Sequence, residues 1–204
     1  MTIVTISREF GAGGRTIGQM VADRMGFTFF DNELIQKVAD KAKVSTEGVV
    51  SLEKEAAGKF QKMISGMIPK RMVDMVRENK VETIDEEVYV DLLTDIIRDI
   101  ADEDNAVIIG RGSQYILEGR KNVFNILIVA DKKDRVNFMR ENYNLTYDQA
   151  VKTVELDDKR RINLYRVFNK TDFNRAERYH LVVNTSKMSI ETAAELIVEL
   201  MQEK

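Results

Sequence analysis

A glycine-rich turn near the start of the chain has the residue types that bind phosphate. Its residues are Gly11, Ala12, Gly13, Gly14, Arg15 and Thr16. Glycine takes positive φ angles and lets the backbone approach a ligand closely, so the N–H groups at the start of a following helix can face an anion. Arg15 adds a fixed positive charge, and Thr16 adds a hydroxyl that can reach a magnesium ion. The turn therefore predicts a phosphate-binding loop.

The spacing in this turn differs from the P-loop pattern G-x-x-x-x-G-K-[ST]. Arg15 stands at the lysine position in one alignment, and Gly14 stands there in the other. Two alternatives stay open, a glycine turn that binds no ligand and a dinucleotide-binding turn. Because Thr16 takes the place of the third glycine in G-x-G-x-x-G, the dinucleotide-binding turn fits less well.

Arg111 is a second candidate for anion binding. It lies between two glycines, directly after the apolar run 106–109. In an open parallel sheet, ligands bind beyond the carboxyl ends of the strands. An arginine at such a position can hold a phosphate through two N–H donors, and the alternative is a solvent-exposed loop arginine. No aspartate ends this run, so the carboxylate that often holds Mg²⁺ in P-loop enzymes is missing from its usual place.

Asp31 and Asn32 follow the short apolar run 27–30 and precede a segment with helical spacing. Either residue is a natural helix N-cap, which is the simpler interpretation. The functional interpretation is that the end of this strand lies beside the glycine loop. Asp31 would then hold Mg²⁺ through water or contact a second substrate. We give the two interpretations equal weight.

The segment from residue 146 onward combines a helix start with many charges. Residues 146–149 have the form of a capping box, and the helix that follows carries basic side chains. These are Lys159, Arg160, Arg161 and Arg166. One interpretation is a solvated face with i,i+4 ion pairs such as Glu155–Lys159 and Asp157–Arg161. The other is a lid whose arginines close over phosphates and neutralise charge in the transition state.

Five apolar runs alternate with segments of helical spacing. The runs are 3–6, 27–30, 106–109, 123–130 and 181–183. This alternation predicts an α/β fold with a doubly wound, mainly parallel five-stranded sheet and helices on both faces. We expect a single domain over 1–204, with a helical insertion at 45–104 as an acceptor-binding cap and a lid region at 146–176.

The stretch 59–77 lies inside the expected insertion and is rich in methionine. Methionines at 63, 67, 72 and 75 surround a break at Gly66 and Pro69. Flexible methionine side chains most simply form a helical packing surface. The alternatives are a substrate cap and a homodimer interface.

Composition limits the function classes. The chain has 204 residues, no cysteine, one histidine and a net charge of −3. Disulfides and thiolate metal sites are therefore excluded, and a histidine-based site has only His180 to build on. The charge balance gives no case for nucleic-acid binding, and no apolar run reaches the ~20 residues that span a bilayer. We expect a cytoplasmic protein that acts on small molecules, with no membrane partner.

Several segments resemble the cytidylate kinase-like family, which comprises distant relatives of bacterial cytidylate kinase. The first is SREFGAGGRTIG at 7–18, and the second is FDNELI at 30–35. Arg111, within IGRG at 109–112, resembles the strand-end arginine of the nucleotide site in cytidylate kinase. Residues 183–191 resemble its final strand, adenine-side loop and last helix.

The resemblance implies the P-loop nucleoside monophosphate kinase fold and transfer of a phosphoryl group from ATP to CMP with Mg²⁺. Residues 11–16 would bind the ATP phosphates, with Arg15 acting in catalysis and Thr16 and Asp31 as metal ligands. Other contacts implied by position are Asn184, Thr185 and Ser186 for adenine, Asp31, Asn32 and Arg111 for the acceptor, and Lys159, Arg160 and Arg161 for the lid. We expect Arg160 and Arg161 to act in catalysis, and Lys159 and Arg166 to bind the substrate. The alternatives are a nucleotide-binding sensor that has the fold without transfer activity, and a kinase for another small metabolite.

Overall fold

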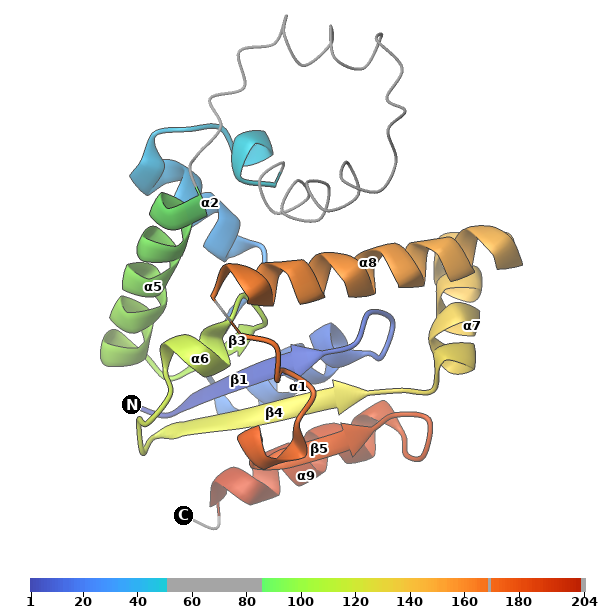
Figure 1. Cartoon of the computed structure of the whole chain (residues 1–204). Coiled ribbons are helices and arrows are strands. Elements are labelled where there is room, and N and C mark those ends of the chain that lie inside the picture. Colours follow the sequence, from blue (N-terminus) through green and yellow to red (C-terminus); the bar gives the residue numbers. More distant parts are fainter. Residues whose placement is uncertain (51–85, 169, 203–204) are drawn as a thin grey trace, which may run out of the picture.

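The chain is built on five parallel strands in one sheet (Figure 1). The computed structural model describes residues 1–50, 86–168 and 170–202. At the centre of the sheet, β1 (Ile3–Arg8) pairs with β3 (Ala106–Ile109) on one side and with β4 (Val123–Val129) on the other. Next to them, β2 (Thr28–Phe30) pairs with β3, and β5 (Leu181–Asn184) pairs with β4. The strand order is therefore β2-β3-β1-β4-β5, and the predicted doubly wound parallel sheet is confirmed.

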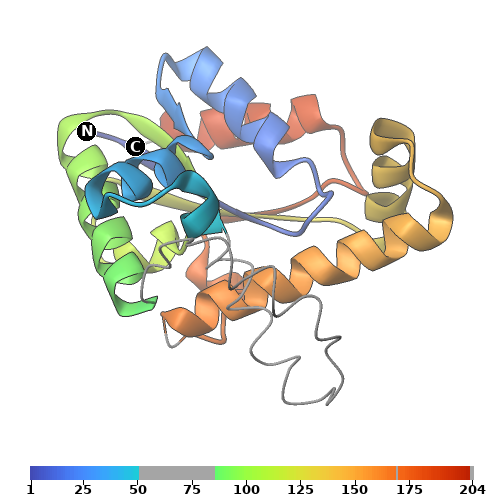
Figure 2. The same cartoon turned by 90° about the horizontal axis from the view of Figure 1, so that it is seen from above.

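Helices cover both faces of the sheet, as Figure 2 shows from above. One face packs against α1 (Gly14–Met25, blue) and α9 (Ile190–Gln202, red). The other face packs against α2 (Glu33–Ala42), α5 (Glu86–Glu103, green) and the short α6 (Ser113–Ile116). Because both faces are covered, the central strands are mostly apolar, and β3 is apolar at every position.

Strand β3 illustrates how one run of residues serves both faces. Ala106 and Ile108 belong to the hydrophobic cluster that contains α2 and α5. Val107 and Ile109 belong to the cluster that contains α1 and α9. Successive side chains of a strand point to opposite faces, so a fully apolar run can fill two cores. The short run at 106–109 is buried along its whole length.

Helix α7 (Lys132–Tyr143) stands beyond the arrowhead of β4, and α8 (Tyr147–Val167) runs back from it alongside the sheet (Figure 1). The two helices pack against each other. The predicted capping box at the start of α8 is confirmed, because Thr146 accepts a hydrogen bond from the N–H of Gln149, whose side chain in turn binds the N–H of Thr146. After α8, the chain passes through a 3₁₀ turn at Ala176–Arg178 into β5.

The buried face of α5 begins at Tyr89 and not at its neighbour Val88. Tyr89 is 1% exposed, whereas Val88 is 48% exposed. The buried stripe is Tyr89, Leu93, Ile96, Ile97, Ile100 and Ala101. A helix has a limited core-facing width, and a large aromatic ring fills the space beside α2 better than valine does.

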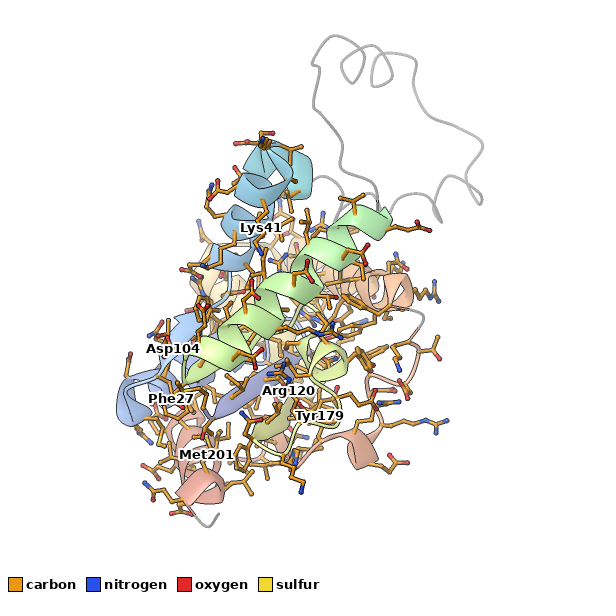
Figure 3. All side chains as sticks on the ribbon, turned by 90° about the vertical axis from the view of Figure 1, so that its left-hand side faces the viewer. Phe27, Lys41, Asp104, Arg120, Tyr179 and Met201 are labelled. Atoms are coloured by element: carbon orange, nitrogen blue, oxygen red, sulfur yellow. The ribbon has the colours of Figure 1, made fainter. Side chains whose placement is uncertain are left out.

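The outward face of α5 is polar, as Figure 3 shows from that side. Asp99 binds Lys41 of α2 at 3.2 Å, and Asp102 binds Arg120 at 2.7 Å. Exposed ion pairs of this kind contribute little to stability. This face lies outside the candidate site, so Arg120 serves below as a control residue.

Part of the expected helical insertion at 45–104 lies outside the described residues, including the methionine-rich stretch 59–77. Its interpretation as a packing surface, acceptor-binding cap or dimer interface stays a prediction. Within the described part of the chain, no helix combines the length and the apolar character needed to cross a membrane.

Candidate active site

The glycine turn connects β1 to α1, as the sequence predicts. Gly11 and Gly13 take left-handed φ angles of 81° and 80°. Gly13 is the N-cap of α1 and has no side chain to satisfy the helix N–H groups. Unsatisfied N–H groups and the helix dipole favour an anion at this end. The loop therefore has the backbone arrangement of a phosphate-binding site.

A cavity of about 340 Å³ lies over this loop. Arg15, Thr16 and Asp31 all line it, together with the loop glycines 11, 13 and 14. A threonine hydroxyl and a carboxylate are hard oxygen donors of the kind Mg²⁺ prefers, and Mg²⁺ bound to nucleotide phosphates needs only one or two protein ligands. No cluster of three or more acidic or histidine ligands occurs among the described residues. Thr16 and Asp31 thus fit a phosphate-bound Mg²⁺ better than an all-protein metal site.

A second cavity of about 280 Å³ adjoins the first and is rich in arginine. We call it the arginine pocket. Its charged lining residues are Arg8, Asp31, Arg111, Asp157, Arg160 and Arg161. Its apolar lining residues are Phe10, Val50, Ile109, Leu164 and Tyr165. The arginines come from three places: the end of β1, the loop after β3, and α8. The pocket therefore collects positive charge at the carboxyl edge of the sheet.

Arg111 sits in a tight turn. It has a φ angle of 57° between Gly110 at 64° and Gly112 at 72°, so three successive residues are left-handed. A Cβ atom at Gly112 would lie 2.7 Å from the ring of Phe168. Burial lowers the pKa of Arg111, and the nearby Asp31 charge opposes that shift. Unfavourable φ angles persist where the surrounding structure holds them, and they cluster at functional sites.

Asp31 is buried and joins the two cavities. Its carboxylate lies 3.2 Å from Nε of Arg15 and 3.7 Å from Nη2 of Arg8. Asn32 occupies the N-cap position of α2, but its side chain makes no capping hydrogen bond. Asn32 is therefore the predicted N-cap by position, but it makes no side-chain cap, because its backbone angles are already helical. The Asp31 carboxylate instead lies beside two arginines.

The charged pairs on α8 differ from the predicted ones. Asp157 binds Arg160 at 3.0 Å and Asp158 binds Arg161 at 3.7 Å, both at i,i+3 spacing. Glu155 binds Lys132 of α7 at 2.7 Å. Neither predicted i,i+4 ion pair, Glu155–Lys159 or Asp157–Arg161, is formed. Lys132 of α7 takes Glu155, and Asp157 and Arg161 each pair with a residue three positions away.

The predicted basic residues of α8 separate into two groups. Arg160 and Arg161 line the arginine pocket, and their side chains are 33% and 18% exposed. Lys159 and Arg166 are exposed and line neither cavity. Arg166 instead donates a hydrogen bond to Asn163 at 3.3 Å. The structure thus brings only the two middle arginines of the predicted lid to the site.

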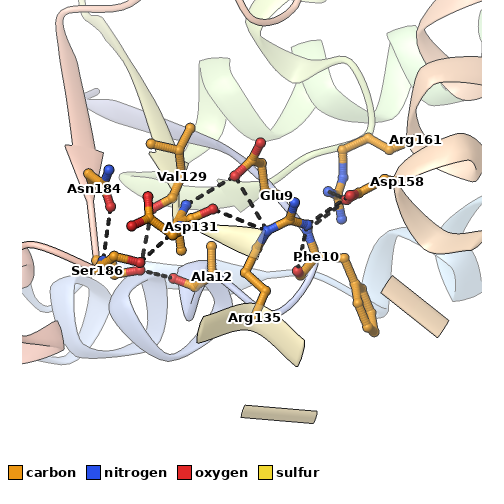
Figure 4. A network of polar contacts seen from close by, with 12 residues as sticks. Glu9, Phe10, Ala12, Val129, Asp131, Arg135, Asp158, Arg161, Asn184 and Ser186 are labelled. Carbon is orange, nitrogen blue, oxygen red and sulfur yellow. Dashed lines mark hydrogen bonds and ion pairs between the residues drawn. The ribbon is translucent and has the colours of Figure 1, made fainter. Parts of the chain in front are cut away.

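The turn after β5 is tied to the glycine loop (Figure 4). The Thr185 hydroxyl donates to the carbonyl oxygen of Ala12 at 3.0 Å. Ser186 Oγ accepts from the N–H of Asp131 at 2.8 Å, and Asn184 Oδ1 accepts from the N–H of Ser186 at 2.9 Å. These contacts give the turn a structural role beside the loop, and its role in binding adenine stays a prediction.

Arg135 is a structural residue that the sequence analysis missed. It is 6% exposed, and its guanidinium binds Asp158 at 2.8 Å and the carbonyl oxygen of Phe10 at 3.2 Å (Figure 4). Glu9 lies 3.6 Å from the same guanidinium. Arg135 therefore fastens α8 to the start of the glycine loop. The available signal was its position four residues before the buried Met139, on the inner face of α7.

Arg8 was missed as well. It is the last residue of β1, after five buried residues, and its side chain is 24% exposed. Burial and the charge of Arg161 lower the pKa of Arg8 to about 10, and the charge of Asp31 opposes this shift. The available signal was a charged residue at the carboxyl end of an otherwise apolar strand.

The sequence model of the cytidylate kinase-like family matches residues 3–187. No curated protein matches the chain. Among solved structures, an uncharacterized protein from Eubacterium ventriosum has a TM-score of 0.71 at 19% identity, with 100% of both chains covered.

Two kinases are also similar in fold. A shikimate kinase from Bacteroides thetaiotaomicron has a TM-score of 0.52 at 13% identity, with 98% of both chains covered. A gluconokinase from Sinorhizobium meliloti has a TM-score of 0.51 at 11% identity, with 99% of this chain and 92% of that chain covered. These likenesses confirm the predicted fold class.

Proposed function

Since the chain belongs to the cytidylate kinase-like family, we propose that it transfers a phosphoryl group from ATP to a nucleoside monophosphate, with CMP as the first acceptor to test. The observation that carries this proposal is the arginine pocket beside the glycine loop. One site with backbone N–H donors and an adjoining site with guanidinium groups suit two phosphate-bearing substrates.

The charge of the arginine pocket supports a phosphate-bearing acceptor. Four arginines face two aspartates in its lining, which leaves an excess of two positive charges. A phosphate monoester carries nearly two negative charges at neutral pH. An uncharged acceptor such as a sugar would make no use of this excess of positive charge. The charge balance therefore favours a monophosphate over a phosphate-free metabolite.

In the proposed reaction, the loop N–H groups hold the ATP phosphates, and Arg15 adds a cation beside them. Arg111 holds the acceptor phosphate through two N–H donors. An oxygen of that phosphate attacks the γ-phosphorus of ATP, the bond to the β,γ-bridging oxygen breaks, and ADP leaves. Arg160 and Arg161 of α8 neutralise the negative charge on the transferring group.

Mg²⁺ belongs to this proposal as a cofactor. Thr16 and Asp31 are the side chains that would hold it, because both supply hard oxygen donors to the loop cavity. When bound, Mg²⁺ withdraws negative charge from the β- and γ-phosphate oxygens.

The decisive experiment measures ADP formation from ATP and Mg²⁺ with a panel of acceptors. The panel contains CMP, dCMP, UMP, AMP and GMP, with shikimate as a phosphate-free acceptor. We expect turnover with at least one monophosphate and formation of the corresponding diphosphate. Turnover with shikimate alone would overturn the proposal.

A nucleotide-binding sensor is the second candidate, because the segment 11–16 contains no lysine. Calorimetry of ATP binding, run beside the assay, separates the two. Tight ATP binding without turnover on any acceptor supports the sensor and contradicts the kinase.

A further inference from the structure

The space beside Gly14 is filled by Arg8. A Cβ atom placed on Gly14 would lie 2.8 Å from both Cβ and Cδ of Arg8. Gly14 is the first residue of α1, and its φ angle is not in the left-handed region, so its backbone does not require glycine. The reason for glycine at this position is therefore the side chain of Arg8.

Gly14 is also the position that takes the lysine when the glycines at 11 and 13 are aligned with those that precede lysine in P-loops. A lysine at 14 and the present Arg8 side chain exclude each other sterically, since both stems need the same space. The chain thus has a glycine where the lysine would stand, and an arginine in the space that the lysine would enter.

The placement of Arg8 fits a residue that serves both substrates. It lines the loop cavity and also the arginine pocket. Its side chain is 24% exposed, whereas that of Arg15 is 63% exposed. Arg15 therefore stands at the solvent side of the loop, and Arg8 stands between the two cavities.

The charge balance around Arg8 favours the binding of an anion there. Arg8 and Arg15 share a single carboxylate, Asp31, at 3.7 and 3.2 Å. Arg161 lines the same pocket as Arg8 and has its own carboxylate partner, Asp158, at 3.7 Å. Because Arg8 shares Asp31 with Arg15, part of the desolvation cost of the Arg8 guanidinium stays uncompensated. A bound phosphate would offset that cost.

We propose that Arg8 supplies, from the end of β1, the positive charge that the P-loop pattern places on a lysine at position 14. A planar guanidinium has five N–H donors on several edges, so it can hold the γ-phosphate of ATP and the acceptor phosphate at the same time. This inference rests on the proposed function and names the residue that replaces the missing lysine.

The test compares Arg8→Gln with the matched variant Arg15→Gln. Glutamine keeps most of the stem that packs on Gly14 and removes the charge. We expect Arg8→Gln to lower kcat at least about 100-fold, the effect of removing one charge-stabilising donor, and Arg15→Gln to lower it less than about tenfold. A threefold or smaller loss in a folded Arg8→Gln protein, established by circular dichroism, would overturn the inference.

A double variant that moves the positive charge from position 8 to position 14 tests whether activity can be restored. Arg8→Gly removes the whole side chain, including the Cβ that a Cβ on residue 14 would meet at 2.8 Å, so Gly14→Lys can be added in the same chain. We expect the double variant to regain at least about tenfold in kcat over Arg8→Gly, because the cation returns from the loop position. A double variant that folds and regains nothing would overturn the inference.

Binding of ATP and ADP by calorimetry separates this inference from the proposed function. A cation at the γ-phosphate should make ATP bind more tightly than ADP, and Arg8→Gln should remove that preference. If the wild-type protein turns over no acceptor, the proposed function fails while the ATP-to-ADP affinity ratio still decides the role of Arg8. An unchanged ratio in Arg8→Gln contradicts that role.

Discussion

The glycine loop and the arginine pocket adjoin each other, yet they are built in different ways. The loop gathers its donors from the consecutive residues 11–16, and most of them are backbone N–H groups. The pocket gathers side chains from positions as far apart as Arg8 and Arg161. A local motif needs only a strand, a turn and a helix, whereas a pocket of arginines needs a complete sheet and a helix laid across its end.

The two regions meet at Asp31 and are held by Arg135. Asp31 contacts one arginine from each region, and Arg135 links the loop residue Phe10 to Asp158 of α8. Under the proposed function, the two regions have separate roles, since the loop binds ATP and the pocket binds the acceptor. The four changes below test whether these roles are separate, from the largest expected effect to the smallest.

Arg111→Ala removes a guanidinium from the pocket and leaves the loop intact. We expect kcat/KM for the acceptor to fall about 1,000-fold, as for loss of a buried bidentate phosphate contact, while the Kd for ATP changes less than about threefold. Steady-state kinetics and calorimetry measure the two effects. Arg120→Ala, which removes an arginine bound to Asp102 on the outer face of α5, is the matched control. If Arg111→Ala weakened ATP binding as much as it lowered kcat/KM for the acceptor, the two regions would not have separate roles.

Thr16→Val is the reciprocal change in the loop. Valine keeps the shape of threonine and removes the hydroxyl, so we expect the Kd for ATP with Mg²⁺ to rise about 30-fold while the acceptor KM stays the same. Titrations with and without Mg²⁺ measure the effect, and Thr16→Ser, which keeps a hydroxyl, should restore most of the affinity. If Thr16→Val bound ATP as tightly as the wild-type protein at saturating Mg²⁺, Thr16 would be excluded as a metal ligand.

Asp158→Asn weakens the junction between the two regions. Arg135 is buried and loses its nearer carboxylate partner, keeping Glu9 at 3.6 Å, and the asparagine amide can still accept hydrogen bonds. We expect the free energy of unfolding to fall by about 2 kcal/mol, since breaking a largely buried ion pair leaves the Arg135 charge less well compensated. Urea denaturation measures this change. A loss below about 0.5 kcal/mol would show that Arg135 does not fasten α8 to the loop.

Thr146→Ala changes the far end of α8. It removes the hydroxyl of the capping box and should lower the free energy of unfolding by about 1 kcal/mol, with kcat unchanged. Thr146→Ser keeps the hydroxyl and serves as the control in thermal unfolding. A large loss of kcat in Thr146→Ala would mean that the pocket depends on the whole of α8 rather than on its middle turn.

The sequence predicted the fold well, because its signals were local and strong. The run 106–109 is apolar at every position and became a central strand, and the alternation of strands with helices required a parallel sheet. The sequence also placed the loop glycines and Arg111 at strand ends, where the structure has them, and their binding roles stay predictions. Lys159 and Arg166 were grouped with the lid arginines, because spacing alone did not give the rotation of α8 about its axis.

The sequence by itself determined the elements, the glycine turn between β1 and α1 and the resemblance to a kinase family. Only the tertiary structure decided which charges meet. The side chain of Arg8 fills the space beside Gly14, Arg135 reaches from α7 to Asp158, and Asp31 joins two arginines instead of capping a helix. Backbone preferences depend on neighbours in the sequence, whereas contacts between charges depend on distances in space, and the folding of the sheet sets those distances.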